Sequence, residues 1–410
     1  MTRTLTGTHV AERDKEIRQR RLHLATELRS LRLGDPVAEN EADVLAEYFV
    51  ETAAFDEVLN SKVMVFVGRK GTGKTANLLR AGEILEDDRR RLVSIIKPFG
   101  YELEAVVRLL ERFPSPDAQD YVVEALWKYL LLSEIALTAA AEIERRPASP
   151  DAGSPEAELL EYLDGPGSTL ALDFAVRLER AIETLLDLPT QARIEDERAR
   201  ITEALHGKPI RDLRRLLGRL LERRTQVAVL IDNLDKPWDR STNLDVLSTF
   251  LLGLLTAVGR LESDFAREDS WRRPVPLTLG VFLRSDIFAR VLRVAREPDK
   301  IPFIRLAWDD PELLLRVVDE RYNAAREQAA TEGELWSKYF TSRVRGIETR
   351  DYILKRILPR PRDIVYFCNA AITTAVNRRH TRIEEDDIFE AERIYSQFSF
   401  EALLVEERVV

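Results

Sequence analysis

The sequence predicts an α/β protein with a parallel-sheet core, a large all-helical insertion and a C-terminal helical lid domain. The first observation is a set of short aliphatic runs without polar alternation, at residues 62–67, 92–96, 226–231 and 275–283. Such runs are typical of parallel strands that helices cover on both faces. The second observation is a helical spacing of apolar residues that fills the stretch between the second and third runs. The third is the return of that spacing beyond residue 308.

These elements divide the 410 residues into four predicted parts. The parts are an N-terminal helical arm (residues 1–60), a core in two pieces (61–100 and 226–308), a helical insertion (101–225) and a C-terminal lid (309–410). In the arm, residues 41–58 are apolar at helical spacing, and in the core a further short strand is predicted at residues 301–306. A chain of this length can bury two or three hydrophobic cores.

Composition favours a cytoplasmic protein without a membrane partner. The chain is 45% hydrophobic and 32% charged, and no apolar run approaches the roughly 18 residues that a membrane span needs. The first residues lack the apolar stretch of a secretory signal. One cysteine, Cys368, and four scattered histidines predict neither an intramolecular disulfide nor a cysteine–histidine metal cluster. Any metal is therefore expected to arrive with a ligand.

Charge argues against a uniformly electropositive, nucleic-acid-coating protein, because 62 basic and 71 acidic residues give a net charge of −9. One local basic stretch runs from Arg13 to Arg32, with acidic residues among its arginines. A solvated amphipathic helix is the favoured interpretation, and a DNA-binding arm is the alternative.

The segment GRKGTGKT, Gly68–Thr75, fits the pattern G-x-x-x-x-G-K-[ST] of a phosphate-binding loop, and it lies between a predicted strand and a predicted helix. Backbone N–H groups can surround phosphates only where the chain adopts positive φ and approaches closely, which glycine permits. Lys74 adds a positive charge, Thr75 offers a hydroxyl to Mg²⁺, and the helix N-terminus adds partial positive charge. The predicted nucleotide-binding residues here are Gly68, Arg69, Lys70, Gly71, Thr72, Gly73, Lys74, Thr75 and Ala76.

The segment VAVLIDNLDKPW supplies the expected carboxylate at the end of a later strand. Asp232 is predicted to hold Mg²⁺ together with Thr75, because ligands bind at the carboxyl ends of strands in open α/β sheets. Asp235 is the candidate for orienting the attacking water, since the neutral Asn233 cannot act as a base. A strand-end turn for Asp232, and a capping or loop role for Asp235, are the structural alternatives.

Three arginines are candidates for contact with phosphate. Arg284 ends the strand within FLRSDIF and could touch the γ-phosphate, or it could pair with Asp286 or a neighbour. Ser285 and Asp286 resemble an N-cap and the first turn of the following helix. In LPRPRDIVYF, Pro361 begins a helix, so Arg360 or Arg362 on a lid could reach the nucleotide or remain surface residues.

A hinge is predicted where the last core strand meets the lid. In IRLAWDDPELL, Asp309 or Asp310 is expected to cap a helix that starts at Pro311.

Taken together, GRKGTGKT, IDNLDK, FLRSDIF and LPRPRDI resemble the AAA+-related P-loop ATPases of the STAND and KAP kind. Origin-recognition ATPases are more distant in appearance, and LGDPVAENEA with GRKGTGKTA is similar to a poorly characterised group of bacterial P-loop ATPases. The resemblance implies a five-stranded parallel core, ATP as the nucleotide, and oligomers in which one subunit completes its neighbour's site. KAP proteins commonly carry membrane helices between the two nucleotide motifs. Here that interval, 232 − 74 = 158 residues, is predicted to hold non-membrane helices.

These observations predict an ATP- and Mg²⁺-binding, ATP-hydrolysing switch or motor that acts on a protein or nucleic-acid partner. Lys74, Asp232, Asp235 and Arg284 are its predicted catalytic residues. Bacterial defence and DNA transactions are the settings that the resemblance leaves open. Two alternatives stand beside it: an ATP-gated DNA-binding loader, and a nucleotide-dependent assembly switch with little hydrolysis.

Overall fold

The computed structural model describes residues 27–98, 103–113, 115–165, 172–187, 201, 210–234, 244–267, 273–326, 330–331 and 333–407. Packing groups the chain into two compact units. The lid unit comprises the chain up to Glu51, Lys70–Ala76 and Ala307–Glu407, and the sheet unit comprises Thr52–Arg69 and Asn77–Leu306. The four-part division expected from the sequence stays a prediction.

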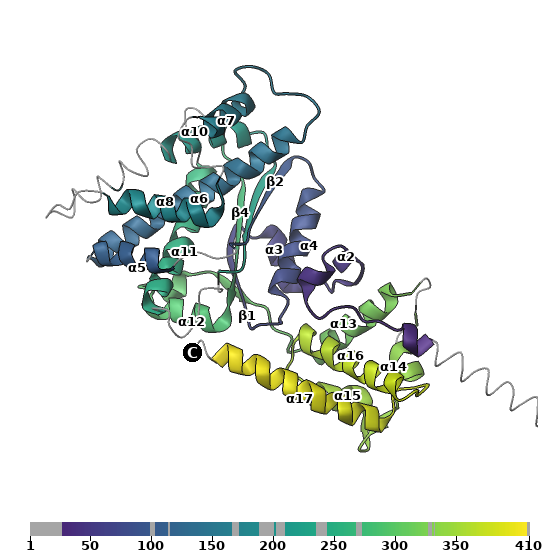
Figure 1. Ribbon diagram of the computed structural model, residues 1–410. Helices are drawn as coiled ribbons and strands as arrows, with labels where there is room; N and C mark the ends of the chain where they lie inside the picture. The colour runs from purple at the N-terminus through teal and green to yellow at the C-terminus, as the bar shows by residue number, and fades with distance from the viewer. Residues whose placement is uncertain are drawn as a thin grey trace, which may run out of the picture. The chain divides into compact units, whose positions relative to one another are not determined.

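The sheet unit is built on a five-stranded parallel sheet (Figure 1). Its strands are β1 (Val63–Gly68), β2 (Arg91–Ile96), β3 (Gln226–Ile231), β4 (Leu277–Arg284) and β5 (Phe303–Arg305), in the order β2-β3-β4-β1-β5. Each corresponds to a strand that the aliphatic runs predict. Because all five strands are parallel, the ends of β1, β3 and β4 lie along one edge, where Gly68 pairs in register with Arg284.

Helices cover both faces of this sheet (Figure 1). On one face lie α3 (Ala53–Asn60) and α4 (Lys74–Glu86), whose Leu59 and Leu85 pack with Val93 of β2 and Ala228 of β3. The other face carries α5, α6, α8, α11 and α12, with bounds Leu103–Arg112, Pro116–Glu144, Phe174–Leu186, Leu244–Ala266 and Ser285–Val294. Cover on both faces explains why the strands contain so few polar residues.

The helices of the predicted insertion share one hydrophobic core with the sheet. Helix α6 contacts β2 and α11, and Trp127 of α6 donates an indole hydrogen bond of 2.8 Å to the carbonyl of Phe250 in α11. Helices α7 (Pro155–Asp164) and α10 (Arg211–Leu221) pack against α6 in turn. The described part of this segment is therefore continuous in packing with the sheet.

Helix α11 satisfies the length and hydropathy of a membrane span, alone among the described helices. Half of its most apolar 18-residue window is buried inside the protein, with Phe250, Leu254 and Val258 in the core. Its apolar character is accounted for by packing against α6 and β4.

The lid unit is mainly helical. Its elements after β5 are α13 (Pro311–Ala324), α14 (Glu334–Tyr339), the hairpin β6 (Arg343–Val344) and β7 (Ile347–Glu348), α15 (Thr349–Leu354), α16 (Pro361–Asn377) and α17 (Glu385–Glu407). The predicted cap is confirmed, because the Asp310 carboxylate accepts from the Glu312 amide at 3.0 Å in front of Pro311.

Residues of the N-terminal arm also belong to the lid unit. Leu28, Leu31 and Leu33 are buried in its core, and Arg321 of α13 donates to the Leu33 carbonyl at 2.7 Å. The helical spacing of residues 41–58 does not give one helix. It divides into η1 (Ala38–Glu41), α2 (Leu45–Tyr48) and α3, because the chain between α2 and α3 takes extended geometry.

Candidate functional site

The predicted phosphate-binding loop joins the end of β1 to the start of α4. Within it Gly71 has φ +84° and Gly73 has φ +88°, values in the left-handed region that favours glycine. Thr72 between them is buried, and Lys74 and Thr75 are half-buried in the first turn of the helix. The backbone therefore has the conformation that the glycine pattern was expected to provide.

Side chains of the lid unit hold the carbonyl side of this loop. Arg360 donates from Nη1 to the Lys70 carbonyl at 2.9 Å, and Trp308 donates from Nε1 to the Thr72 carbonyl at 3.0 Å. The amide of Arg362 lies 3.5 Å from the Gly71 carbonyl, which is a long contact. The three successive carbonyls of residues 70–72 are thus each contacted by a donor from the lid unit.

Arg360 is buried and does not have the surface role that the sequence left open for it. Its guanidinium pairs with Glu406 of α17 at 2.9 Å, and the two side chains are 3% and 8% exposed. Because Nη1 also serves the Lys70 carbonyl, Arg360 links the loop to the end of α17. The pairing of Glu406 with Arg360 was not predicted, because a glutamate near the end of a helix gives no sign of a buried partner 46 positions away.

Arg362 lies beside the loop. A Cβ placed at Gly71 would come within 2.9 Å of Arg362 Nε, so the glycine is required for this close approach. Nε and Nη2 of Arg362 are shielded from solvent and have no hydrogen-bond partner among the described residues. The guanidinium lies over the Phe398 ring at 5.3 Å, and Nε is 3.8 Å from the Asp363 carboxylate.

Asp363 is itself fully buried. Its Oδ1 accepts from the Tyr395 hydroxyl at 2.8 Å, and burial raises the pKa of the Asp363 carboxyl. Its Oδ2 has no hydrogen-bond partner in the described part of the chain. Arg362 therefore combines a positive charge with two unused donors, which is the equipment needed to bind an anionic oxygen.

At the edge of the sheet unit, Asp232 directly follows β3 and is 3% exposed. Its amide donates to the Ile96 carbonyl at 3.0 Å, which continues the pairing of β3 with β2. The next residue, Asn233, turns the chain with φ +64°, a conformation that asparagine tolerates better than most residues. The predicted water-orienting residue, Asp235, lies outside the described residues.

Arg284 makes the ion pair that the sequence gave as its alternative role. Nε and Nη2 contact the two carboxylate oxygens of Asp286 at 3.2 and 2.6 Å, and the Arg284 side chain is 10% exposed. The predicted cap by Ser285 is wrong: Arg284 occupies the N-cap position without a side-chain cap bond, and Ser285 is already helical. The Asp286 carboxylate serves the arginine because the two side chains extend from the same tight strand-to-helix junction.

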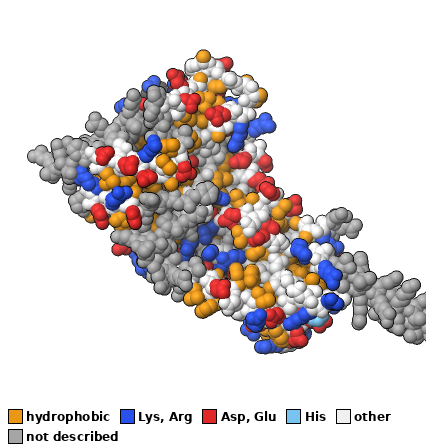
Figure 2. All heavy atoms as spheres, in the orientation of Figure 1, with side chains coloured by type: hydrophobic (Ala, Val, Ile, Leu, Met, Phe, Trp, Pro, Cys, Tyr) orange, Lys and Arg blue, Asp and Glu red, His pale blue; other side chains and the backbone are white. Residues whose placement is uncertain are grey.

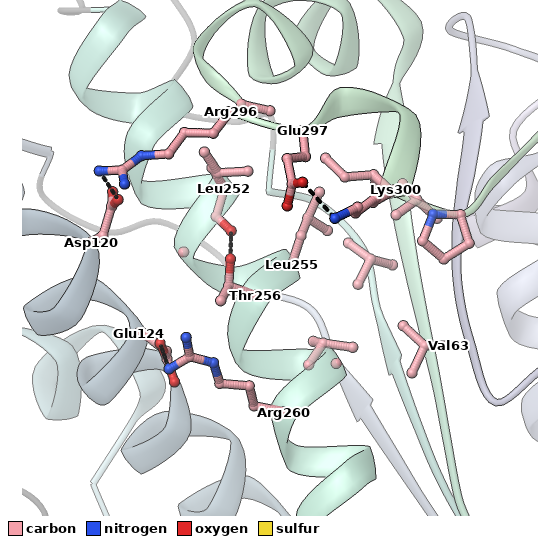
Figure 3. A pocket seen from close by; sticks show the side chains of 18 of the residues that line it. Val63, Asp120, Glu124, Leu252, Leu255, Thr256, Arg260, Arg296, Glu297 and Lys300 are labelled. Carbon is pink, nitrogen blue, oxygen red and sulfur yellow. Dashed lines mark hydrogen bonds and ion pairs between the residues drawn. The ribbon is translucent and has the colours of Figure 1, made fainter. Parts of the chain in front are cut away.

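A separate cavity of about 910 Å³ opens at the opposite end of β1, where Val63 lines it (Figure 3). Charged side chains from α6 and α11 extend into it together with Arg296, Glu297 and Lys300. These charges pair with each other: Arg296 lies 3.3 Å from Asp120, Lys300 lies 2.5 Å from Glu297, and Arg260 pairs with Glu124. The three basic side chains of the lining are thus paired, but five carboxylates against three basic groups leave the cavity with an acidic excess, at the end of β1 away from Gly68.

Basic and acidic side chains are interspersed on the described part of the face shown in Figure 2. The basic stretch Arg13–Arg32 lies mostly outside the described residues, so the structure gives no account of it as an arm.

The five-stranded parallel sheet, helices on both faces and glycine loop after β1 define an α/β fold of the P-loop NTPase kind, with a compatible helical lid. Residues 312–404 match a family model described as the FunZ-associated C-terminal helical domain. That match falls within the lid unit, from α13 to α17.

Over 378 residues the chain is 24% identical to the "Putative transposon gamma-delta 80.3 kDa protein" of Escherichia coli (strain K12). The aligned part covers 90% of this chain and 51% of that protein, so the chain spans about half the length of this relative. The likeness therefore runs through both units.

Two solved structures of the Aeropyrum pernix ORC2 protein are also similar. The one with ADPNP–ADP complexes is 10% identical and covers 87% of this chain and 68% of that chain, with a TM-score of 0.36. The ADP form is 13% identical, with 87% and 67% covered and the same TM-score of 0.36. At these TM-scores the likeness carries no argument about this chain.

Proposed function

We propose that this chain is a P-loop ATPase that binds Mg²⁺–ATP at Gly68–Thr75. The observation that carries the proposal is the backbone of the loop, with positive φ at Gly71 and Gly73 between a parallel strand and a helix N-terminus. That conformation turns successive N–H groups toward an anion, and the helix dipole favours negative charge at the same place. A glycine turn without this role would not need both residues in the left-handed region.

Within the loop, Lys74 is the proposed charge partner of the β- and γ-phosphates, and Thr75 is a proposed Mg²⁺ ligand. The hydroxyl of Thr75 stands in the first turn of α4, where a hard, oxygen-seeking cation bound to phosphates can be reached. Arg69 and Lys70 lie within the loop and Ala76 directly follows it, and all three are proposed to line the nucleotide site. The metal would neutralise charge that develops on the transferred phosphoryl group.

At the sheet edge, Asp232 is the proposed carboxylate ligand of Mg²⁺, in addition to the Thr75 hydroxyl. Support comes from its position after β3, whose end lies along the same edge as the end of β1. Asp235 is proposed to orient the attacking water. Arg284 is proposed to exchange its pairing with Asp286 for the γ-phosphate, since both contacts use the same bidentate fork.

Arg362, placed by the helix start at Pro361, is the proposed lid contact to the nucleotide. Its two unused donors and its closeness to Gly71 support this role. Loss of the γ-phosphate would release an arginine of α16, and α16 packs along α17. Nucleotide state would thereby reach the lid helices, as in an AAA+-related switch or motor of the STAND/KAP kind that acts on a protein or nucleic-acid partner.

The test is Mg²⁺-dependent ATP hydrolysis by the intact chain across a protein concentration series, with oligomer mass recorded in the same samples. Lys74→Ala and Asp235→Asn should abolish turnover, because one removes the phosphate charge and the other the water-orienting carboxylate. Lys62→Ala is the matched control, since Lys62 is a lysine on the amino side of β1 whose side chain is 78% exposed. Turnover per subunit that rises with concentration would indicate an assembled ATPase. Equal turnover in wild type and Lys74→Ala would contradict the proposal.

A second candidate is a nucleotide-dependent assembly switch with little hydrolysis. Asn233 favours it, because it directly follows Asp232 with a neutral amide that cannot act as a base. This candidate predicts tight nucleotide binding and a nucleotide-dependent change of mass, with no phosphate release.

A further inference from the structure

We propose that Trp308 is a positioning residue that holds the phosphate-binding loop open for its ligand by fixing the carbonyl of Thr72. This inference rests on the proposed function and assigns a residue to it that the motif does not contain. Trp308 lies between β5 and α13, and its indole is 9% exposed. Its Nε1 donates to the Thr72 carbonyl at 3.0 Å across 236 positions of sequence.

The geometry of the peptide unit gives this bond its consequence. In a trans peptide the carbonyl of one residue and the N–H of the next point in opposite directions. A donor that holds the Thr72 carbonyl therefore also turns the Gly73 N–H away from Trp308. Arg360 has the same effect two residues earlier in the loop, because its bond to the Lys70 carbonyl orients the Gly71 N–H.

Gly71 and Gly73 are the two loop residues with positive φ. Their amides are among those that the proposed function assigns to the phosphates. A flexible glycine loop would otherwise lose conformational entropy when a phosphate orders it. Fixing its carbonyls in advance removes part of that loss before the ligand arrives. Trp308 would act on affinity through the backbone, without touching the nucleotide itself.

The lid unit provides a matched control. Trp336 of α14 is 7% exposed and donates from Nε1 to the Asp319 carboxylate at 3.0 Å. The substitutions Trp308→Phe and Trp336→Phe each remove one buried indole donor and keep an aromatic ring. A purely structural role for Trp308 predicts a loss of stability from each substitution and no change in nucleotide affinity from either.

The experiment is titration of the intact chain with Mg²⁺–ADP and Mg²⁺–ATP, together with thermal unfolding without ligand. Trp308→Phe should weaken binding of both nucleotides about five- to tenfold, because the ligand must then order a loop residue that the indole no longer fixes. Trp336→Phe should bind as the wild type does. In steady-state assays the KM for ATP should rise in Trp308→Phe while kcat stays within about twofold, because the lost interaction is equal in ground and transition states.

Each outcome decides between the two proposals. Unchanged binding by Trp308→Phe, with binding lost in Lys74→Ala, would overturn the role of Trp308 and leave the nucleotide site intact. No binding by the wild type would overturn the proposed function and this inference with it. If Trp308→Phe unfolds, position 308 is filled instead with β-(3-benzothienyl)alanine, which keeps the indole shape and lacks only the donor. The same loss of affinity is then expected.

Discussion

Replacing Arg362 by methionine should separate nucleotide affinity from stability. The Arg362 side chain is 12% exposed, and its Nε and Nη2 lack hydrogen-bond partners among the described residues. If both donors bind phosphate oxygens, each charged hydrogen bond contributes about 1.5–3 kcal/mol, so Arg362→Met should cost at least about 3 kcal/mol of binding. That corresponds to a roughly 100-fold rise in the Kd for Mg²⁺–ATP.

The free protein should respond weakly to the same change. Losing the cation–π contact with Phe398 costs about 0.5–1 kcal/mol. Losing the nearby positive charge also leaves the buried Asp363 carboxyl less compensated, although burial already raises its pKa. Removing two buried, unsatisfied N–H groups offsets these losses by about 1–3 kcal/mol. Arg362→Met should therefore lower the free energy of unfolding of the free chain by no more than about 1 kcal/mol, and a gain in stability is compatible with the same reasoning.

Arg360→Met is the comparison, two positions away. It breaks a buried pair with Glu406, so it should cost about 3–5 kcal/mol of stability in urea unfolding. Binding is measured by titration calorimetry on both variants. If Arg362→Met binds Mg²⁺–ATP within twofold of the wild type, or unfolds as easily as Arg360→Met, Arg362 is not a nucleotide contact of the kind described.

Three further predictions concern the packing and charges that support the site. Gly253→Ala in α11 should destabilise the protein by about 1–3 kcal/mol in chemical unfolding, because its Cβ would lie 2.3 Å from a side-chain atom of α6. Gly259→Ala is the control in the same helix: its Cβ meets no atom within 4 Å, so it should stabilise the protein by up to about 1 kcal/mol. Asp310→Ala should cost about 1 kcal/mol by removing the cap of α13, and Asp310→Asn should restore most of it. A hydrogen bond to Asp387 raises the pKa of His380, so His380→Gln should lower the melting temperature near pH 6 and have little effect near about pH 9.

Each of these has a contradicting result. If the Gly253→Ala and Gly259→Ala variants are equally stable, α6 and α11 accommodate the added Cβ at position 253 without loss of stability. If Asp310→Ala is as stable as the wild type, the Asp310 cap does not stabilise α13. For His380 the raised pKa means that its stabilising contribution is complete below about pH 6.5 and is lost as pH rises through the folded-state pKa. A loss of stability confined to high pH would contradict that sign.

The strands and the loop were predictable because their signals are local. Val227–Ile231 is a continuous aliphatic run, and its burial on both faces leaves few other structures for it. The glycine spacing in Gly68–Thr75 likewise fixes a backbone conformation within eight successive residues. In both cases the residues that carry the signal are also the residues that form the structure.

What the sequence did not reveal depends on distant partners. The bond from Trp308 to Thr72 spans 236 positions, and neither residue has a pattern that points to the other. The β6–β7 hairpin was not expected, because each strand has only two residues and three of those four are exposed. The sequence also left open whether Arg284 contacts phosphate or forms an ion pair with Asp286. A separation of two residues permits that ion pair but does not require it.

Direct binding of Mg²⁺–ATP to the intact chain tests the central claim, with wild type, Lys74→Ala and Lys62→Ala compared by titration calorimetry. We expect one nucleotide per chain for the wild type and for Lys62→Ala. For Lys74→Ala we expect a Kd weaker by about 10- to 100-fold, the value of one charged contact to phosphate. Binding that is absent in the wild type, or equal in wild type and Lys74→Ala, would contradict the assignment of Gly68–Thr75 as a nucleotide site.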